Sequence, residues 1–191
     1  MDLAGTSDEI LLTRLRAGCE DSFSTLYRRH QGRIFRFAFA MSGSETIAEE
    51  VTQEVFLALI GPACSFDRGR GNVAAFLLGM TRNYVLHHLR QNGRYAPLPE
   101  GAGETVDPGL ALAGVTRQET IEAVRRAVLS LPLPYREAVA LCDLEEMDYS
   151  EAAASLDCPV GTVRSRLHRG RALLAEKLAD FAGVETSPRS S

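Results

Sequence analysis

The 191-residue sequence contains no long apolar run. A helix that crosses a membrane needs at least about 18 mostly apolar residues, so the sequence predicts no membrane span. The segment from Met1 to Gly5 has neither the basic stretch nor the apolar stretch of a secretory signal. We therefore expect a cytoplasmic protein that needs no membrane insertion.

Cysteine and lysine are also scarce. The four cysteines, Cys19, Cys64, Cys142 and Cys158, form no C-x-x-C pair and have no zinc-binding spacing. They predict reduced, mostly buried thiols and no metal site, although the pattern leaves redox activity open. Because Lys177 is the only lysine, the positive charge is almost entirely arginine.

Strand patterns are missing as well. No segment alternates strictly between polar and apolar residues, whereas apolar residues recur at helical spacing on both sides of residues 95–116. That stretch contains three prolines, several glycines, three acidic residues and no basic residue, as in a flexible linker. We predict an all-α protein of two small helical domains, a first block (1–94) and a second block (117–182), which are joined by a flexible linker (95–116) and followed by a flexible tail (183–191).

The first block predicts four helices. Ser7 can cap the first helix, a second contains Phe23 to Ala38, and a third runs from about 45 to 60. The third helix has an apolar stripe and an opposite polar face made of Glu49, Glu50, Gln53 and Glu54. The fourth runs from about 73 to 92, and its polar face contains Asn83, His87, Arg90 and Arg94.

The second block ends in a predicted helix-turn-helix. A stripe from Ile121 to Leu131 and a helix over 135–144 come first. Asp148 and Glu151 have capping-box spacing at the start of a short helix over 149–156. Asp157 and Cys158 form a tight turn, and Pro159 suits the first position of the last helix.

Charge is sorted along this second block. Residues 136–157 contain one basic residue and seven acidic ones, whereas residues 158–171 contain four arginines and no acid. A helix in the DNA major groove lies between two rows of phosphates, which repel carboxylates and attract arginine. The predicted outer face of the last helix consists of Thr162, Arg164, Ser165, Arg166, His168, Arg169 and Arg171. Two alternatives remain open: a solvated helix paired with the acids upstream, and a helix that binds an acidic protein.

Four quoted stretches resemble the extracytoplasmic-function (ECF) group of bacterial sigma factors. "EDSFSTLYRRH", "AEEVTQEVFLAL" and "FDRGRGNVAAFLLGMTRNYVLHHLRQNGR" resemble region 2, and "PVGTVRSRLHR" resembles region 4. The resemblance implies a transcription initiation factor, with no enzymatic activity and no cofactor. A simple DNA-binding regulator that needs no polymerase is the alternative that shares only the second block.

The resemblance also implies a role for each block. Region 2 would bind the β′ clamp helices of core RNA polymerase through Glu49, Glu50, Gln53 and Glu54. It would capture the opened −10 element of promoter DNA through Arg68, Arg70, Asn72, Arg82, Asn83, His87 and Arg90. Region 4 would bind the duplex −35 element and the β flap, with Arg164, Ser165, His168 and Arg169 reading bases and Arg166 and Arg171 binding phosphate or aiding packing. An anti-sigma factor is an expected further partner.

Several positions depart from the family pattern. Phe76 stands where tryptophan is usual, and Glu50 and His87 stand where aspartate is common. His87 is one of the residues that the resemblance assigns to the −10 element. Asp157 replaces a common glycine, so the sequence leaves the geometry of the turn open.

Overall fold

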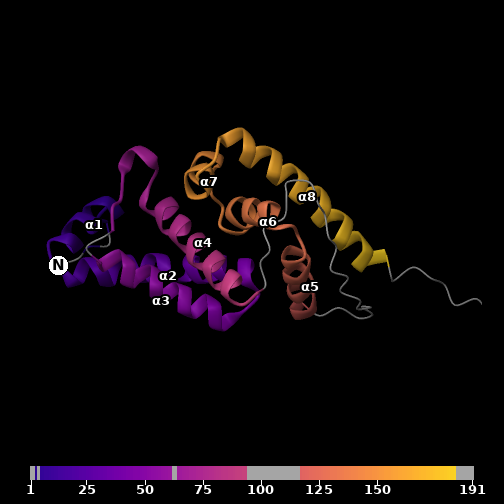
Figure 1. The fold of residues 1–191 in the computed structure, drawn as a ribbon, viewed down its shortest axis with the longest axis horizontal. Coiled ribbons are helices and arrows are strands. Elements are labelled where there is room, and N and C mark those ends of the chain that lie inside the picture. Colours follow the sequence, from indigo (N-terminus) through magenta and orange to yellow (C-terminus); the bar gives the residue numbers. More distant parts are fainter. Residues whose placement is uncertain (1–2, 4, 62–63, 94–116, 184–191) are drawn as a thin grey trace, which may run out of the picture.

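The computed structural model describes residues 3, 5–61, 64–93 and 117–183. Within these ranges the chain is all-α and contains no strand, as predicted (Figure 1). The elements are α1 (Asp8–Arg16), α2 (Glu20–Ser42), α3 (Glu45–Ile60), η1 (Arg68–Arg70), α4 (Val73–Gln91), α5 (Arg117–Leu129), α6 (Leu133–Val139), η2 (Ala140–Leu144), α7 (Tyr149–Leu156) and α8 (Val160–Gly183). The predicted linker and all of the predicted tail except Gly183 lie outside the described residues. No helix of the described ranges has the length and apolar character to cross a membrane.

The first block is a bundle around the long helix α2. Helices α1, α3 and α4 pack on α2, and α3 also packs on α4. Gly43 ends α2 in the left-handed conformation (φ 68°), and the Ser44 hydroxyl then accepts the Ile47 N–H to start α3. Asn72 starts α4, because its Oδ1 accepts the Ala75 N–H at 2.8 Å. These local signals place α3 and α4 almost where the sequence predicts them.

The second block places α8 across α5, α6 and α7. The predicted capping box is present: Asp148 Oδ1 accepts the Glu151 N–H at 2.8 Å, and Glu151 Oε2 accepts the Asp148 N–H at 3.1 Å. The helix predicted over 135–144 begins at Leu133 instead. It changes to the π-helix η2 at Ala140, so the prediction of one regular helix was wrong there.

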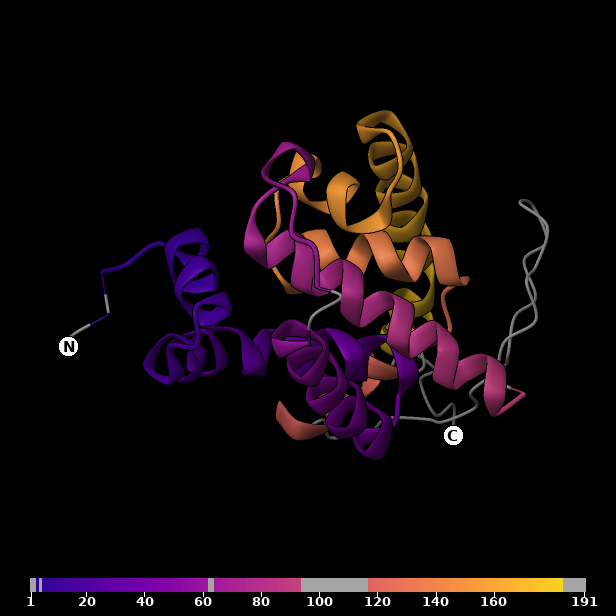
Figure 2. The ribbon, with the colours of Figure 1, turned by 60° about the vertical axis from the view of Figure 1, so that its left-hand side comes forward.

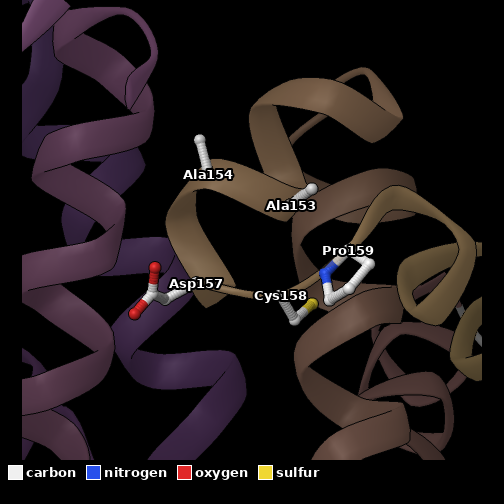
Figure 3. Close-up of a pocket in the computed structure, with 5 residues that line it drawn as sticks. All are labelled: Ala153, Ala154, Asp157, Cys158 and Pro159. Atoms are coloured by element: carbon white, nitrogen blue, oxygen red, sulfur yellow. The ribbon is translucent and has the colours of Figure 1, made fainter. Parts of the chain in front are cut away.

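The turn of the helix-turn-helix depends on Asp157. Its backbone is left-handed (φ 50°, ψ 47°), the conformation in which glycine is the usual residue. Aspartate is one of the few other residues that enter this region readily, so the turn keeps its geometry without glycine. Figure 3 shows Asp157, Cys158 and Pro159 lining an open pocket beside the small side chains of Ala153 and Ala154.

The two blocks pack against each other. Helix α7 lies beside α4, and α5, α6 and η2 contact α2 (Figures 1 and 2). Leu141, Met147 and Leu156 of the second block belong to the same buried apolar cluster as the core of the first. A smaller cluster, which includes Val128 and Leu167, lies within the second block. The described parts of the two blocks therefore share one continuous core.

Candidate nucleic-acid interface

Helix α8 packs through one apolar side. Val163 and Leu167 are buried, and Val160 and Leu174 are half-buried, as their spacing predicts. Gly170 is buried where α8 crosses α6: a Cβ there would lie 2.9 Å from Val139 Cγ2. This close crossing fixes the rotation of α8, and so determines which residues face outward.

The outer face of α8 contains the predicted −35 residues. Arg164, Ser165, His168, Arg169 and Arg171 are exposed, whereas Thr162 and Arg166 are half-buried. The guanidinium carbon of Arg164 lies 5.4 Å from the centre of the Tyr149 ring, a cation–π contact. The Ser165 hydroxyl donates to the Thr162 carbonyl at 3.0 Å. The structure thus brings five of the seven residues onto one exposed surface.

Arg171 makes a two-pronged ion pair with an upstream acid. Its Nη2 and Nε lie 2.6 and 3.1 Å from the two carboxylate oxygens of Asp143. The hydrogen bond and the charge of Asp143 raise the pKa of Arg171. Arg171 therefore agrees with the alternative in which the last helix pairs with the acidic residues upstream of it. Glu137, Glu145 and Glu151 instead contact the first block.

The predicted −10 residues of α4 fall into two groups. Asn83, His87 and Arg90 are exposed along one side of the helix, and His87 Nε2 lies 2.9 Å from Gln91 Nε2. Arg82 is only 25% exposed, and its Nε donates to Glu137 Oε1 of the second block at 2.6 Å. Arg94, on the same predicted face, lies outside the described residues.

The loop before α4 holds the remaining −10 candidates. Arg68 is exposed in η1, where Asp67 Oδ1 accepts the Gly69 N–H at 2.8 Å. The side chain of Arg70 is not among those described. Asn72 caps α4 with its oxygen and donates from Nδ2 to Glu151 of the second block. The structure therefore separates the −10 candidates, because Asn72 and Arg82 turn toward the second block.

The predicted polymerase-binding face lies on α3. Glu49, Glu50 and Gln53 are exposed, and Glu54 is half-exposed. His88 of α4 lies between two of these residues, with Nδ1 3.6 Å from Glu50 Oε2 and Nε2 3.2 Å from Glu54 Oε2.

Sequence reasoning missed two apolar members of this α3 face. Leu57 and Ile60 are 64% and 54% exposed, respectively. Leu57 lies one helical turn beyond Gln53 and outside the buried stripe, so its spacing could have revealed it.

Comparison with known proteins identifies the family. The family profile of Sigma-70 region 2 matches residues 26–95, and that of Sigma-70 region 4 matches residues 121–174. The "ECF RNA polymerase sigma-E factor" of Escherichia coli is 30% identical over 182 residues, which cover 90% of this chain and 94% of the relative. The chain belongs to the ECF RNA polymerase sigma factors. This confirms the resemblance and makes the chain a promoter-directing transcription initiation factor by family.

A longer relative matches as well. The "ECF RNA polymerase sigma factor SigE" of Mycolicibacterium smegmatis is 35% identical to this sigma factor over 161 residues. The match covers 83% of this chain but 62% of that protein, so it spans less than two thirds of the mycobacterial relative.

Solved structures support the fold of this sigma factor. CnrH, in complex with the cytosolic domain of CnrY, has a TM-score of 0.69 at 24% identity and covers 91% of this chain and 97% of its own. The sigma factor RpoE, in complex with the anti-sigma factor NepR from Bartonella quintana, has a TM-score of 0.63 at 25% identity. That match covers 82% of this chain and 96% of RpoE.

The cysteine thiols of this sigma factor are less buried than the sequence predicts. All four cysteines are free, as expected, but each is half-buried rather than buried. Burial raises the pKa of the Cys142 thiol to about 11. Hydrogen bonding to Ser22 instead lowers the pKa of the Cys19 thiol.

Proposed function

We propose that this sigma factor directs core RNA polymerase to specific promoters through α8 and holds the melted −10 element through α4. The observation that carries the proposal is the outer face of α8, where Arg164, His168 and Arg169 are exposed on the second helix of a helix-turn-helix. An arginine fork can contact guanine O6 and N7 or clamp a phosphate. Since no acidic residue lies between Cys158 and Arg171, this helix can approach a phosphate row without repulsion.

The two blocks would divide the work. The α3 face of Glu49, Glu50, Gln53 and Glu54 would bind the β′ clamp helices, and region 4 would contact the β flap as well as the duplex −35 element. The exposed apolar side chains of Leu57 and Ile60 support a protein partner for α3, because they adjoin its acidic side chains.

The −10 element would be held as a single strand. Arg68, Asn83, His87 and Arg90 offer exposed cationic and polar groups along the loop and α4, which suits contact with a phosphate backbone and with unstacked bases. Arg70, Asn72 and Arg82 complete the proposed set. Binding there would favour strand opening because it stabilises only the melted DNA.

An anti-sigma factor is the further partner that we propose. RpoE, the relative described above, is in a complex with the anti-sigma factor NepR. The cytoplasmic location also stays a prediction.

Run-off transcription tests the proposed function. Core RNA polymerase is combined with the full chain on DNA that contains the promoter upstream of its own gene, and transcripts are mapped. We expect one selected start site that requires the chain. A double variant, Arg164→Ala/Arg169→Ala, should still bind core polymerase in a pull-down but lose the start site. No gain in start-site selectivity over core enzyme alone would refute the proposal, and failure to retain core polymerase would favour the simple DNA-binding regulator.

A further inference from the structure

Two glutamates of the second block are buried against arginines of the first. Glu145, 1% exposed, accepts from Arg36 Nε and Nη2 at 3.0 and 2.9 Å and from Arg33 Nε at 3.3 Å. Glu137, 2% exposed, accepts from Arg82 Nε at 2.6 Å. Removing a carboxylate from water is costly unless it is paired, and both sets of partners come from the other block. These buried pairs therefore exist only while the blocks are together.

The local backbone presents Glu145 to its partners. The π-helix η2 ends at Leu144, directly before Glu145, and Glu146 follows with a left-handed φ of 54°. A π-helix is rare, and a left-handed φ is uncommon for residues other than glycine; both persist where the surrounding contacts fix them. The irregular end of this helix thus serves the contact with α2.

Hydrogen bonds other than salt bridges support the same interface. Glu151 accepts from Asn72 Nδ2, and the Ser155 hydroxyl donates to the Ala75 carbonyl at 3.0 Å. Arg136 donates to the Met41 carbonyl at 2.8 Å. We name the charged and amide contacts the interblock clasp; its members are Arg33, Arg36, Asn72, Arg82, Glu137, Glu145 and Glu151.

The interblock clasp overlaps the proposed −10 site. Arg82 and Asn72 are two of the proposed −10 residues, and each already binds a carboxylate oxygen of the second block. A carboxylate and a phosphate are both anionic oxygen ligands, so they compete for the same donors. The outer face of α8, by contrast, is exposed while the clasp is closed.

We propose that the second block inhibits the first in the free chain, with Glu137 and Glu151 occupying the donors that single-stranded DNA needs. Glu145 holds the closed arrangement through Arg33 and Arg36 without touching a proposed −10 residue. The complete −10 site becomes available only when the blocks part, because Asn72 and Arg82 are then released, whereas the outer face of α8 remains available in both arrangements. The identity of the competing ligand rests on the proposed function.

The test compares two pairs of neutralised glutamates in the full chain. Glu137→Gln/Glu145→Gln removes two clasp charges, and Glu122→Gln/Glu176→Gln removes two charges from exposed positions outside the clasp. The probes are fluorescent DNAs from the promoter upstream of the chain's own gene, one the single non-template strand and one the duplex. Small-angle X-ray scattering gives the radius of gyration of each variant without DNA.

The clasp variant should show a larger radius of gyration and bind the single strand at least about tenfold more tightly than the control variant, because apparent affinity scales with the open fraction. Its affinity for the duplex should match that of the control. An unchanged radius with equal single-strand affinity would overturn the proposal, and so would an equal gain for the duplex, which would indicate a general charge effect.

A charge swap tests the same ion pair independently, by repulsion and rescue. Glu145→Arg should open the chain by repulsion, and Arg36→Glu added to it should restore the parent radius and single-strand affinity. Failure of this rescue would overturn the clasp. Loss of promoter-selective transcription by the unaltered chain would instead refute the proposed function, so the two failures are distinguishable.

Discussion

At the scale of single residues, Arg164 is the clearest candidate for reading a base. Its guanidinium lies over the ring of Tyr149 and is exposed. The contact with the ring orients the side chain and leaves its N–H donors available for a base. We expect Arg164→Ala to cost about 1–3 kcal/mol on promoters that carry the base it reads. Run-off competition between promoters that differ at single −35 positions measures this loss, and an equal loss on every promoter would contradict base reading.

Arg171→Ala is the matched comparison. Asp143 already binds Arg171 with both oxygens, and exposed pairs of this kind contribute about 0–1 kcal/mol to stability. On DNA we expect Arg171 to exchange Asp143 for a phosphate, so this variant should weaken all promoters alike and lower the salt slope of binding by about one. A loss confined to one −35 base would assign it a reading role instead.

The four thiols should differ in reactivity. A pKa of about 11 keeps the Cys142 thiol protonated near pH 8, whereas the lowered pKa of Cys19 increases its thiolate fraction. Since the thiolate is the nucleophile, iodoacetamide should modify Cys19 well before Cys142, and the rate at Cys142 should keep rising as the pH approaches 11. Mass spectrometry of timed samples measures both rates; equal rates at pH 8 would contradict this assignment.

At the scale of elements, the capping box of α7 determines where the helix-turn-helix begins. We expect Asp148→Ala to lower the free energy of unfolding by about 0.5–2 kcal/mol, because the Glu151 N–H loses its acceptor. Asp148→Asn keeps an acceptor and should stay close to the parent chain. Urea unfolding of the three proteins provides the measurement, and an equal loss for asparagine and alanine would show that the negative charge, not the cap, stabilises α7.

Elements with local start signals could be predicted from the sequence, and those shaped by distant contacts could not. Helices α3 and α7 have their predicted bounds because Ser44 and Asp148 lie directly before them and cap them. The helix predicted over 135–144 changes to η2 where Glu145 must reach Arg36, 109 positions away in the chain. No local pattern encodes a partner at that distance.

In the candidate site, too, residues placed by helical spacing could be predicted from the sequence, and residues placed by contacts between the blocks could not. Spacing on α8 predicts which residues face outward, because one buried stripe fixes the rotation of the helix. Spacing on α4 placed Asn83, His87 and Arg90 together correctly, but it could not show that Arg82 would contact Glu137. Acidic residues such as Glu137 and Glu145 look solvated in the sequence, since only the packing of the blocks buries them.

At the scale of the whole molecule, the packing of the two blocks can be tested with a bulky side chain at their interface, as well as with changes of charge. Gly79 of α4 faces α7 so closely that a Cβ would lie 3.1 Å from the Ser155 carbonyl oxygen. A leucine side chain at this position cannot fit while Ser155 stays in place. Within α4 alone, leucine is favoured over glycine by about 0.5–1 kcal/mol, so the first block should keep its helix.

We therefore expect Gly79→Leu to increase the radius of gyration in small-angle scattering while the far-ultraviolet circular dichroism stays unchanged. Gly161→Leu is the matched control, because a Cβ at Gly161 of α8 meets no atom within 4 Å. The control should keep the parent radius. If Gly79→Leu also kept it, the blocks would already be apart in solution, and the contact of α4 with α7 would not describe the free chain.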